Sequence, residues 1–137
     1  MKQVNKFVQI RTLQKLTNIT QTIIDFIKSS NVLNGIINLS ILHTSASLIV
    51  QENADDDVLK DLTIFFNKLV PEHNDYNHSS EGIDDMPAHI KASLTQNQLT
   101  FSIVDGNIIL GVWQGIFLFE HRANARKRSI FCHIIGE

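Results

Sequence analysis

The stretch Ile36–His43, which reads IINLSILH, decides the fold class because its apolar residues recur at every second position. This period is typical of a β-strand that buries one face. The buried face would carry Ile37, Leu39, Ile41 and His43. We therefore predict a strand whose inward face ends at a histidine.

On the N-terminal side of this strand, the sequence predicts a further strand and a helix. Residues 6–13 alternate as a strand does. Apolar residues then recur at helical spacing from Ile19 to Ile27, with Thr17 or Asn18 as the candidate cap and Asn34-Gly35 as the stop signal. We expect this helix to cover a sheet.

On the C-terminal side, a second apolar run at residues 48–50 leads into a helix with an apolar stripe from Val58 to Leu69. Pro71 closes the helix, and Asn53 or Asp55 is the candidate cap. The long polar segment that follows, up to Asp85, has no periodicity and is predicted to be a loop. Loops of this length in compact domains are often functional.

The last third of the chain predicts a short helix and then strands. Pro87 would start a helix that ends near Leu94. After an alternating segment at residues 99–103, Asp105-Gly106 supplies a hairpin turn, and a long strand is expected from Ile108. A final strand is expected at residues 128–135. The prediction is a single compact α+β domain over residues 1–137, with a mostly antiparallel sheet covered by two or three helices.

The composition excludes several classes of protein. The chain has 137 residues, of which 43% are hydrophobic and 19% charged, as in ordinary globular proteins. A net charge of −2 gives no overall reason to bind nucleic acid or an anionic membrane. No apolar run approaches the roughly 18 to 20 residues of a membrane span. One cysteine excludes an intrachain disulfide, and we expect a cytoplasmic protein.

Three of the six histidines are candidate metal ligands. His43 lies at a strand end, His78 in the long loop and His89 in the short helix. Three histidines with an open position would form a catalytic zinc site. The alternative is that each is an ordinary surface or hydrogen-bonded core histidine.

Carboxylates and hydroxyls surround these histidines in sequence. Glu52, Asp55, Asp57 and Asp61 straddle the start of the long helix, where they could bind a divalent cation, act as acid and base, or form a solvated first turn. Spacing alone favours the solvated turn. The hydroxyls of Thr44, Ser45 and Ser47 follow His43, so they could supply a nucleophile or donate to a substrate phosphate.

Two features near the C-terminus could also contribute to a site. The basic cluster at residues 122–128 contains Arg122 and Arg126, and is either a solvated turn or a phosphate site. Trp113 and Gln114 lie between two glycines. A large ring there is more often part of a core than a ligand platform, but its polar neighbour can orient a ligand.

The order of these motifs resembles the YjbQ-like family, which is labelled secondary thiamine-phosphate synthase. The resemblance rests on HTSASL (43–48), EN (52–53), Asp55, Asp61, Val70-Pro71, Tyr76, His78, EGIDDMPAHI (81–90), GVWQGI (111–116) and EHR (120–122). Gln51 and Asp56 depart from the asparagine and proline that the family pattern has there. The resemblance implies a compact α+β subunit in a homotrimer, with a polar pocket that could be lined by more than one subunit.

Motifs and resemblance together predict one site. Its catalytic residues would be His43, Glu52, Asp61, His89 and Glu120. Its ligand-binding residues would be Thr44, Ser45, Asn53, Trp113, Gln114 and Arg122. Its metal ligands would be His43, His78 and His89 for a divalent ion, zinc or magnesium.

The resemblance also implies a reaction, the joining of a hydroxymethylpyrimidine diphosphate to a thiazole phosphate with loss of pyrophosphate. A chain of 137 residues cannot hold a (β/α)₈ barrel of typically about 250 residues, the fold of ordinary thiamine-phosphate synthases, so the activity would be convergent. A cation on Glu52, Asp55 or Asp61, together with Arg122 or Arg126, would stabilise the leaving group. The alternatives are a zinc-dependent hydrolase and a non-catalytic binder of a phosphorylated metabolite.

Overall fold

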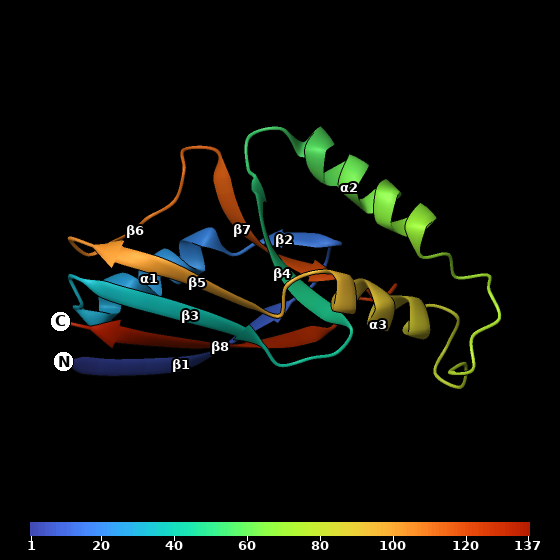
Figure 1. The fold of residues 1–137 in the computed structure, drawn as a ribbon, viewed down its shortest axis with the longest axis horizontal. Coiled ribbons are helices and arrows are strands. Elements are labelled where there is room, and N and C mark those ends of the chain that lie inside the picture. The colour runs from blue at the N-terminus through green and yellow to red at the C-terminus, as the bar shows by residue number, and fades with distance from the viewer.

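The computed structural model describes all residues from 1 to 137, which form eight strands and three helices (Figure 1). The strands are β1 (Lys2–Arg11), β2 (Leu16–Asn18), β3 (Gly35–Ile41), β4 (Ala46–Glu52), β5 (Gln98–Val104), β6 (Asn107–Ile108), β7 (Gln114–Glu120) and β8 (Lys127–Gly136). The helices are α1 (Thr20–Ser30), α2 (Asp56–Leu69) and α3 (Asp85–Leu94).

The strands form two antiparallel sheets, which confirms the predicted α+β class. The larger sheet has the order β1-β8-β3-β5-β6, and the smaller has the order β2-β7-β4. Strand β8 lies between the first strand of the chain and β3, so Lys2 pairs with Gly136 and both termini lie at the same end of the sheet (Figure 1). The pairing of β1 with β8 therefore holds the two ends of the chain side by side.

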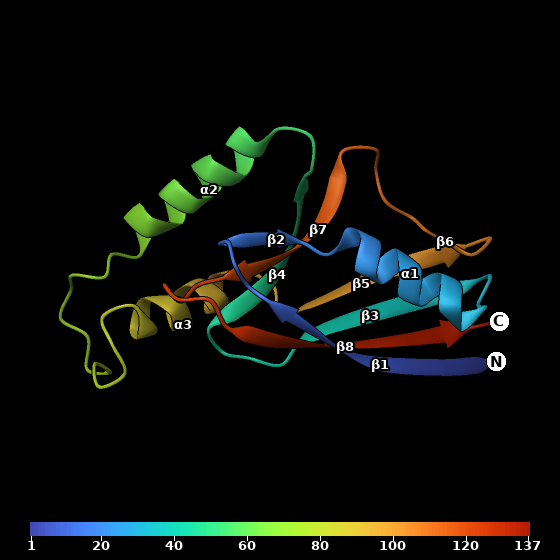
Figure 2. The ribbon, with the colours of Figure 1, turned by 180° about the vertical axis from the view of Figure 1, so that it is seen from behind.

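The core lies between the two sheets and α1, which crosses the back of the larger sheet (Figure 2). Alternation along β3 buries Ile37, Leu39 and Ile41, as their spacing predicted. Helix α1 adds Ile23, Phe26 and Ile27 to the same core. The hydrophobic effect on this contiguous cluster holds both sheets and α1 together.

Local signals define the ends of α1. The Asn18 side chain accepts a hydrogen bond from the Thr20 backbone N–H at 3.0 Å, so it satisfies one of the free donors at the helix start. The helix ends at Asn31, whose φ of +55° is the left-handed conformation common at helix ends. This end comes before the predicted stop at Asn34-Gly35. Asparagine tolerates the left-handed region, so no glycine is needed.

Helix α2 lies outside the main core (Figure 1). It contributes no buried residue, although its apolar stripe was predicted from the sequence. Phe66 packs edge-on against Phe119 at a centroid distance of 5.5 Å, whereas Phe65 and Leu69 are more than half exposed. The helix period was therefore predicted correctly, but part of the apolar face stays exposed and the rest is only half-buried.

The predicted long strand after Ile108 is wrong. Strand β6 ends at Ile108, and residues 109–113 form a connection before β7. A hydrogen bond from the Gly111 N–H to the Gln114 side-chain oxygen, at 2.7 Å, closes this connection into a turn. The Asp105-Gly106 hairpin turn is confirmed, because both residues have positive φ, at 49° and 75°. None of the three helices has the length and apolar content that a membrane span requires.

Candidate functional site

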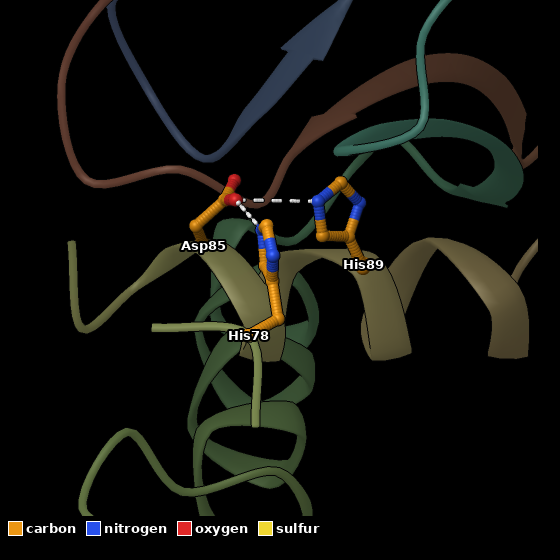
Figure 3. A group of neighbouring side chains, drawn as sticks. All are labelled: His78, Asp85 and His89. Carbon is orange, nitrogen blue, oxygen red and sulfur yellow. Dashed lines mark hydrogen bonds and ion pairs between the residues drawn. The ribbon is translucent and has the colours of Figure 1, made fainter. Parts of the chain in front are cut away.

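The long loop and α3 bring two histidines and one aspartate together (Figure 3). His78 Nε2 lies 2.6 Å from Asp85 Oδ2, and His89 Nε2 lies 3.3 Å from the same oxygen. One ligand atom from each residue lies within 4.8 Å of the others. These three residues, which we call the His78–Asp85–His89 cluster, are the group in the structure best suited to hold a metal ion.

Helix α3 positions two members of the cluster. Asp85 and His89 are four residues apart, so their side chains lie on one face of the helix. His78 reaches the same point from the loop that precedes α3 (Figure 3). The Asp85 side chain is only 2% exposed, whereas His78 is 42% exposed. The cluster is therefore a buried carboxylate with two histidines on its solvent side.

Arg122, just beyond the end of β7, fixes the Asp85 carboxylate from the other side. Its Nη1 donates to Asp85 Oδ1 at 2.6 Å, and its Nε donates to Asp84 Oδ2 at 2.9 Å. Its Nη2 donates to the Glu81 carbonyl oxygen at 2.9 Å. Arg122 was predicted to bind ligand. In the structure its three guanidinium nitrogens donate to Asp84, Asp85 and Glu81, so it holds the loop against α3.

The ion pairs set the charge of the cluster. Burial alone raises the pKa of Asp85, but the hydrogen bond from His78 and the charge of Arg122 outweigh it and hold the pKa below its ordinary value. The hydrogen bond to Asp84 in turn raises the pKa of Arg122. Asp85 is therefore an ionised carboxylate, which is the form that binds a metal.

The tautomer of His89 points to a cation at the cluster. His89 Nδ1 lies 2.9 Å from the Thr44 carbonyl oxygen, which can only accept, so Nδ1 carries a proton. In a neutral ring Nε2 would then present a lone pair to Asp85 Oδ2, 3.3 Å away. Two acceptors repel at this distance, so either a second proton or a metal ion must lie between them.

The donor set fits zinc. Two histidine nitrogens and one carboxylate oxygen, with one position left open, form a typical catalytic zinc set. Bonds of about 2.0 to 2.1 Å at a tetrahedral ion place ligand atoms about 3.4 Å apart. The 3.3 Å between His89 and Asp85 matches this spacing. His78 is too close to Asp85 at 2.6 Å and would have to swing outward, which its exposed position on the loop allows.

His43, the third predicted metal ligand, does not join this cluster. It follows the end of β3, and its Nε2 accepts a hydrogen bond from the Ser129 backbone N–H at 2.8 Å. Burial and, next, the nearby charge of Arg128 lower the pKa of His43. The ring accepts a hydrogen bond that ties the connection after β3 to β8, and Asp85 takes the third position at the cluster instead.

Glu120, predicted to be catalytic, forms a buried ion pair with Arg128. Arg128 Nε donates to one carboxylate oxygen at 2.7 Å, and the Thr12 hydroxyl donates to the same oxygen at 2.7 Å. Burial raises the pKa of Glu120, but these bonds outweigh it and lower the pKa. Arg128 also donates to the Ser45 hydroxyl, so Ser45 belongs to this buried network rather than to an open pocket.

The remaining predicted residues lie at the opposite end of strand β4. Ala46 pairs with Glu120 at one end of the strand, and Glu52 pairs with Gln114 at the other. Six steps of about 3.3 Å put these ends about 20 Å apart. The far group consists of Glu52, Asn53, Asp55, Asp61, Trp113 and Gln114. Within one chain, the predicted site residues therefore fall into two groups at opposite ends of β4.

Local contacts define the far group. The Asn53 backbone N–H donates to the Trp113 carbonyl at 2.9 Å, and its side chain donates to the Gln114 carbonyl at 3.2 Å. The Glu52 carboxylate accepts from the Asp55 N–H at 2.9 Å. Asp61 is exposed on α2, and the Trp113 ring is exposed rather than part of the core.

The spacing rules missed Asp85 as a ligand. The sequence did contain a signal, since Asp85 and His89 are separated by one helical turn. Lys91, a buried lysine of α3, was not predicted as a binding residue either, because a lysine inside a helix is ordinarily solvated.

The fold and the site define a class of protein: a small α+β domain that carries a cluster of two histidines around a buried carboxylate. The family model described as "UPF0047 protein YjbQ-like" matches residues 6–137, so the chain belongs to this family. The resemblance seen in the sequence motifs is confirmed.

Relatives and solved structures agree with this assignment. The chain is 49% identical to a UPF0047 protein of Synechocystis, over 90% of this chain and 85% of that protein. It is 44% identical to the UPF0047 protein YjbQ of Escherichia coli O157:H7, over 75% of each. A YjbQ/UPF0047 family structure from Clostridium acetobutylicum is 32% identical, with a TM-score of 0.87 over 95% of this chain and 99% of that one.

Proposed function

We propose that the protein is a zinc-dependent hydrolase of a small phosphorylated metabolite, with the metal held by the His78–Asp85–His89 cluster. The proposal is carried by the contact between His89 Nε2 and Asp85 Oδ2 at 3.3 Å, which a second proton or a metal ion would complete, and by the place of His78 beside the same oxygen. Three protein ligands and an open position suit a water molecule as the fourth ligand.

Each residue has a defined role in this proposal. Bound zinc would lower the pKa of its water to about 7 and supply a hydroxide nucleophile. Thr44 holds the His89 ring through Nδ1, which fixes the nitrogen that faces the metal. Arg122 binds Asp85 Oδ1, so Asp85 Oδ2 is the oxygen that faces the histidines. His78 is on the loop side of the cluster, where its side chain is the most exposed of the three.

The geometry supports hydrolysis better than thiamine-phosphate synthesis. Loss of pyrophosphate would need a cation near free arginines, and the proposed ligands for it were Glu52, Asp55 and Asp61. Asp55 instead caps α2, and Arg122 is bound to Asp84 and Asp85, which leaves only Arg126 of the two proposed arginines without an ion pair. A non-catalytic binder would hold the same ligand without converting it. A measurement of activity therefore distinguishes a binder from a hydrolase.

Metal content tests the proposal. Protein produced with zinc in the medium should contain about one zinc per chain by inductively coupled plasma mass spectrometry. His89→Ala should lose most of this zinc, and so should Asp85→Asn. His133→Gln is the matched control, because the side chain of His133 lies outside the cluster and hydrogen-bonds only to Gln3 on the edge strand β1.

Activity completes the test. The zinc-loaded protein should hydrolyse a chromogenic phosphate monoester, and Asp85→Asn should abolish the rate. A wild-type protein that binds no zinc would contradict the metal site. A zinc-loaded protein that binds phosphorylated ligands without turnover would instead support the non-catalytic binder. Product formation from the pyrimidine diphosphate and thiazole phosphate would favour the synthase.

We further propose that the chain acts in the cytoplasm as a homotrimer. The metal ligands all come from one chain, so the trimer is not needed to hold the ion. It would matter for the substrate, because a neighbouring subunit could bring the far group around Trp113 toward the cluster of the first.

A further inference from the structure

A cavity of about 540 Å³ lies among the end of α2, helix α3 and the segment after β7. Its lining includes two lysines, Lys15 and Lys91, and two histidines, His73 and His121. Glu72 is the only acidic residue in the lining. The cavity walls therefore carry an excess of positive charge.

Lys91 is an unusual residue in this position, because it is only 7% exposed. Its ammonium donates to the Asn67 side-chain oxygen at 2.7 Å, and no carboxylate oxygen lies within 4.0 Å of it. A buried ammonium is costly unless an anion is paired with it. A lysine also has three donors, and only one is used here.

Two other cavity residues have unused hydrogen-bonding capacity. Lys15 Nζ donates to the Arg122 carbonyl oxygen at 2.6 Å and has no carboxylate partner. His121 is buried, and its ring nitrogen Nδ1 has no hydrogen-bond partner in the protein. A ligand in the cavity would meet two ammonium groups that the chain leaves without a counter-ion.

We propose that this cavity is a binding site for a phosphate-type oxyanion, held by Lys91 and Lys15. The site is separate from the His78–Asp85–His89 cluster. Lys91 and His89 are two residues apart on α3, which places their side chains about 200° apart around the helix axis. The inference goes beyond the proposed hydrolase and does not rest on it.

Thermal unfolding in the presence of inorganic phosphate tests the site. A ligand that binds only the folded protein raises its melting temperature, so about 10 mM phosphate should raise that of wild type by about 3 °C. Lys91→Met removes the charge and keeps most of the side-chain stem. This variant should lose the phosphate-dependent shift, and isothermal titration calorimetry should show at least about a 10-fold weaker Kd.

The controls separate a specific site from general effects of anions. Lys60→Met is the matched control, because Lys60 is an exposed lysine of α2 paired with Asp57 at the surface. It should keep the wild-type shift, and potassium chloride at equal ionic strength should produce none. An equal shift in Lys91→Met, or no shift in wild type, would overturn the proposal.

Two further measurements identify the natural source of the anion and the place where it binds. If methyl phosphate binds more tightly than inorganic phosphate, the natural ligand is a phosphorylated metabolite. If inorganic phosphate binds more tightly, the ligand is the free ion. Protein stripped of metal with EDTA should keep the shift, since the cavity does not use the His78–Asp85–His89 cluster. Loss of the shift on stripping would place the anion at the metal and would refute a separate site.

Discussion

The His121 imidazole is held neutral inside the protein. Its Nε2 lies 2.8 Å from the buried Ser47 hydroxyl, which Thr95 also contacts at 2.6 Å. Burial, and then the charges of Lys91 and Lys15, lower the pKa of His121 to about 3. Protonation in the folded state would add a third positive charge beside two lysines, so the ring remains neutral at physiological pH.

This lowered pKa predicts a loss of stability in mild acid. The unfolded chain takes up a proton at His121 below pH 6.5, whereas the folded protein does so only near pH 3. Stability from this residue is therefore present above pH 6.5 and falls as the pH drops toward 3. Between pH 7.5 and pH 5 the free energy of unfolding should fall by about 2 kcal/mol from this residue.

Urea unfolding at the two pH values, in phosphate-free buffer, measures the effect. His121→Gln should lack this part of the pH dependence, so wild type and variant should converge by about 2 kcal/mol at the lower pH. His133→Gln, at a half-buried position on β8 outside the contacts of His121, should follow wild type. Parallel pH profiles for wild type and His121→Gln would show that His121 is not held neutral.

At the scale of single residues, the sequence indicated which side chains could bind a metal more readily than which side chains would contact each other. It selected His78 and His89 from residue type and position, and the structure brings both to one carboxylate. It did not select Asp85, because helical spacing places Asp85 and His89 on one face but cannot show which face meets the loop. It included His43, whose partner is a backbone N–H 86 residues away in sequence. Such a contact depends on strand register, which no local pattern specifies.

Among the elements, α2 depends most on its own local interactions. It has no fully buried residue, and only Leu59 and Phe66 pack against a small apolar cluster of the smaller sheet, so its end contacts matter more than in α1. The Asp55 side chain accepts from the Asp57 N–H at 2.9 Å and caps the helix. Asp56 and Asp57 add negative charge where the helix dipole favours it.

The cap predicts a specific pattern for substitutions of Asp55. Asp55→Ala should destabilise α2 by about 1 kcal/mol, because the first-turn donor loses its partner, whereas Asp55→Ser should keep the cap. Hydrogen exchange measured by mass spectrometry should show faster exchange across residues 56–69 in Asp55→Ala only. If Asp55 instead binds a cation, serine would fail as alanine does, and both variants would lose the metal.

Element prediction succeeded where one face of an element is buried in the chain. The alternation in β3 and the helical period of α1 correspond to real core positions. Prediction failed at residues 109–113, because an apolar run between glycines does not distinguish a strand from a turn. The hydrogen bond between the Gly111 N–H and the Gln114 side chain stabilises the turn, and its formation depends on side-chain geometry that the sequence does not show.

At the scale of the whole molecule, many large apolar side chains are exposed, and two groups of them lie close together in sequence. Ile64, Phe65 and Leu69 form an exposed face on α2, which we call the α2 apolar face. Val112 and Trp113 are exposed on the connection before β7. Contiguous exposed apolar residues of this kind mark interaction surfaces. Strand order and the separation of the predicted site into two groups follow from long-range pairing, so neither was readable from sequence.

The proposed homotrimer gives the α2 apolar face a partner in a second copy of this chain. Size-exclusion chromatography with light scattering should give a mass three times the 15.5 kDa of one chain. Ile64→Glu combined with Phe65→Glu would bury two charges in that interface, so the trimer should dissociate at micromolar concentration. Leu33→Glu is the control, because Leu33 is exposed on the connection after α1. A wild-type monomer would contradict the trimer. A trimer that survives the double substitution would exclude the α2 apolar face as its interface.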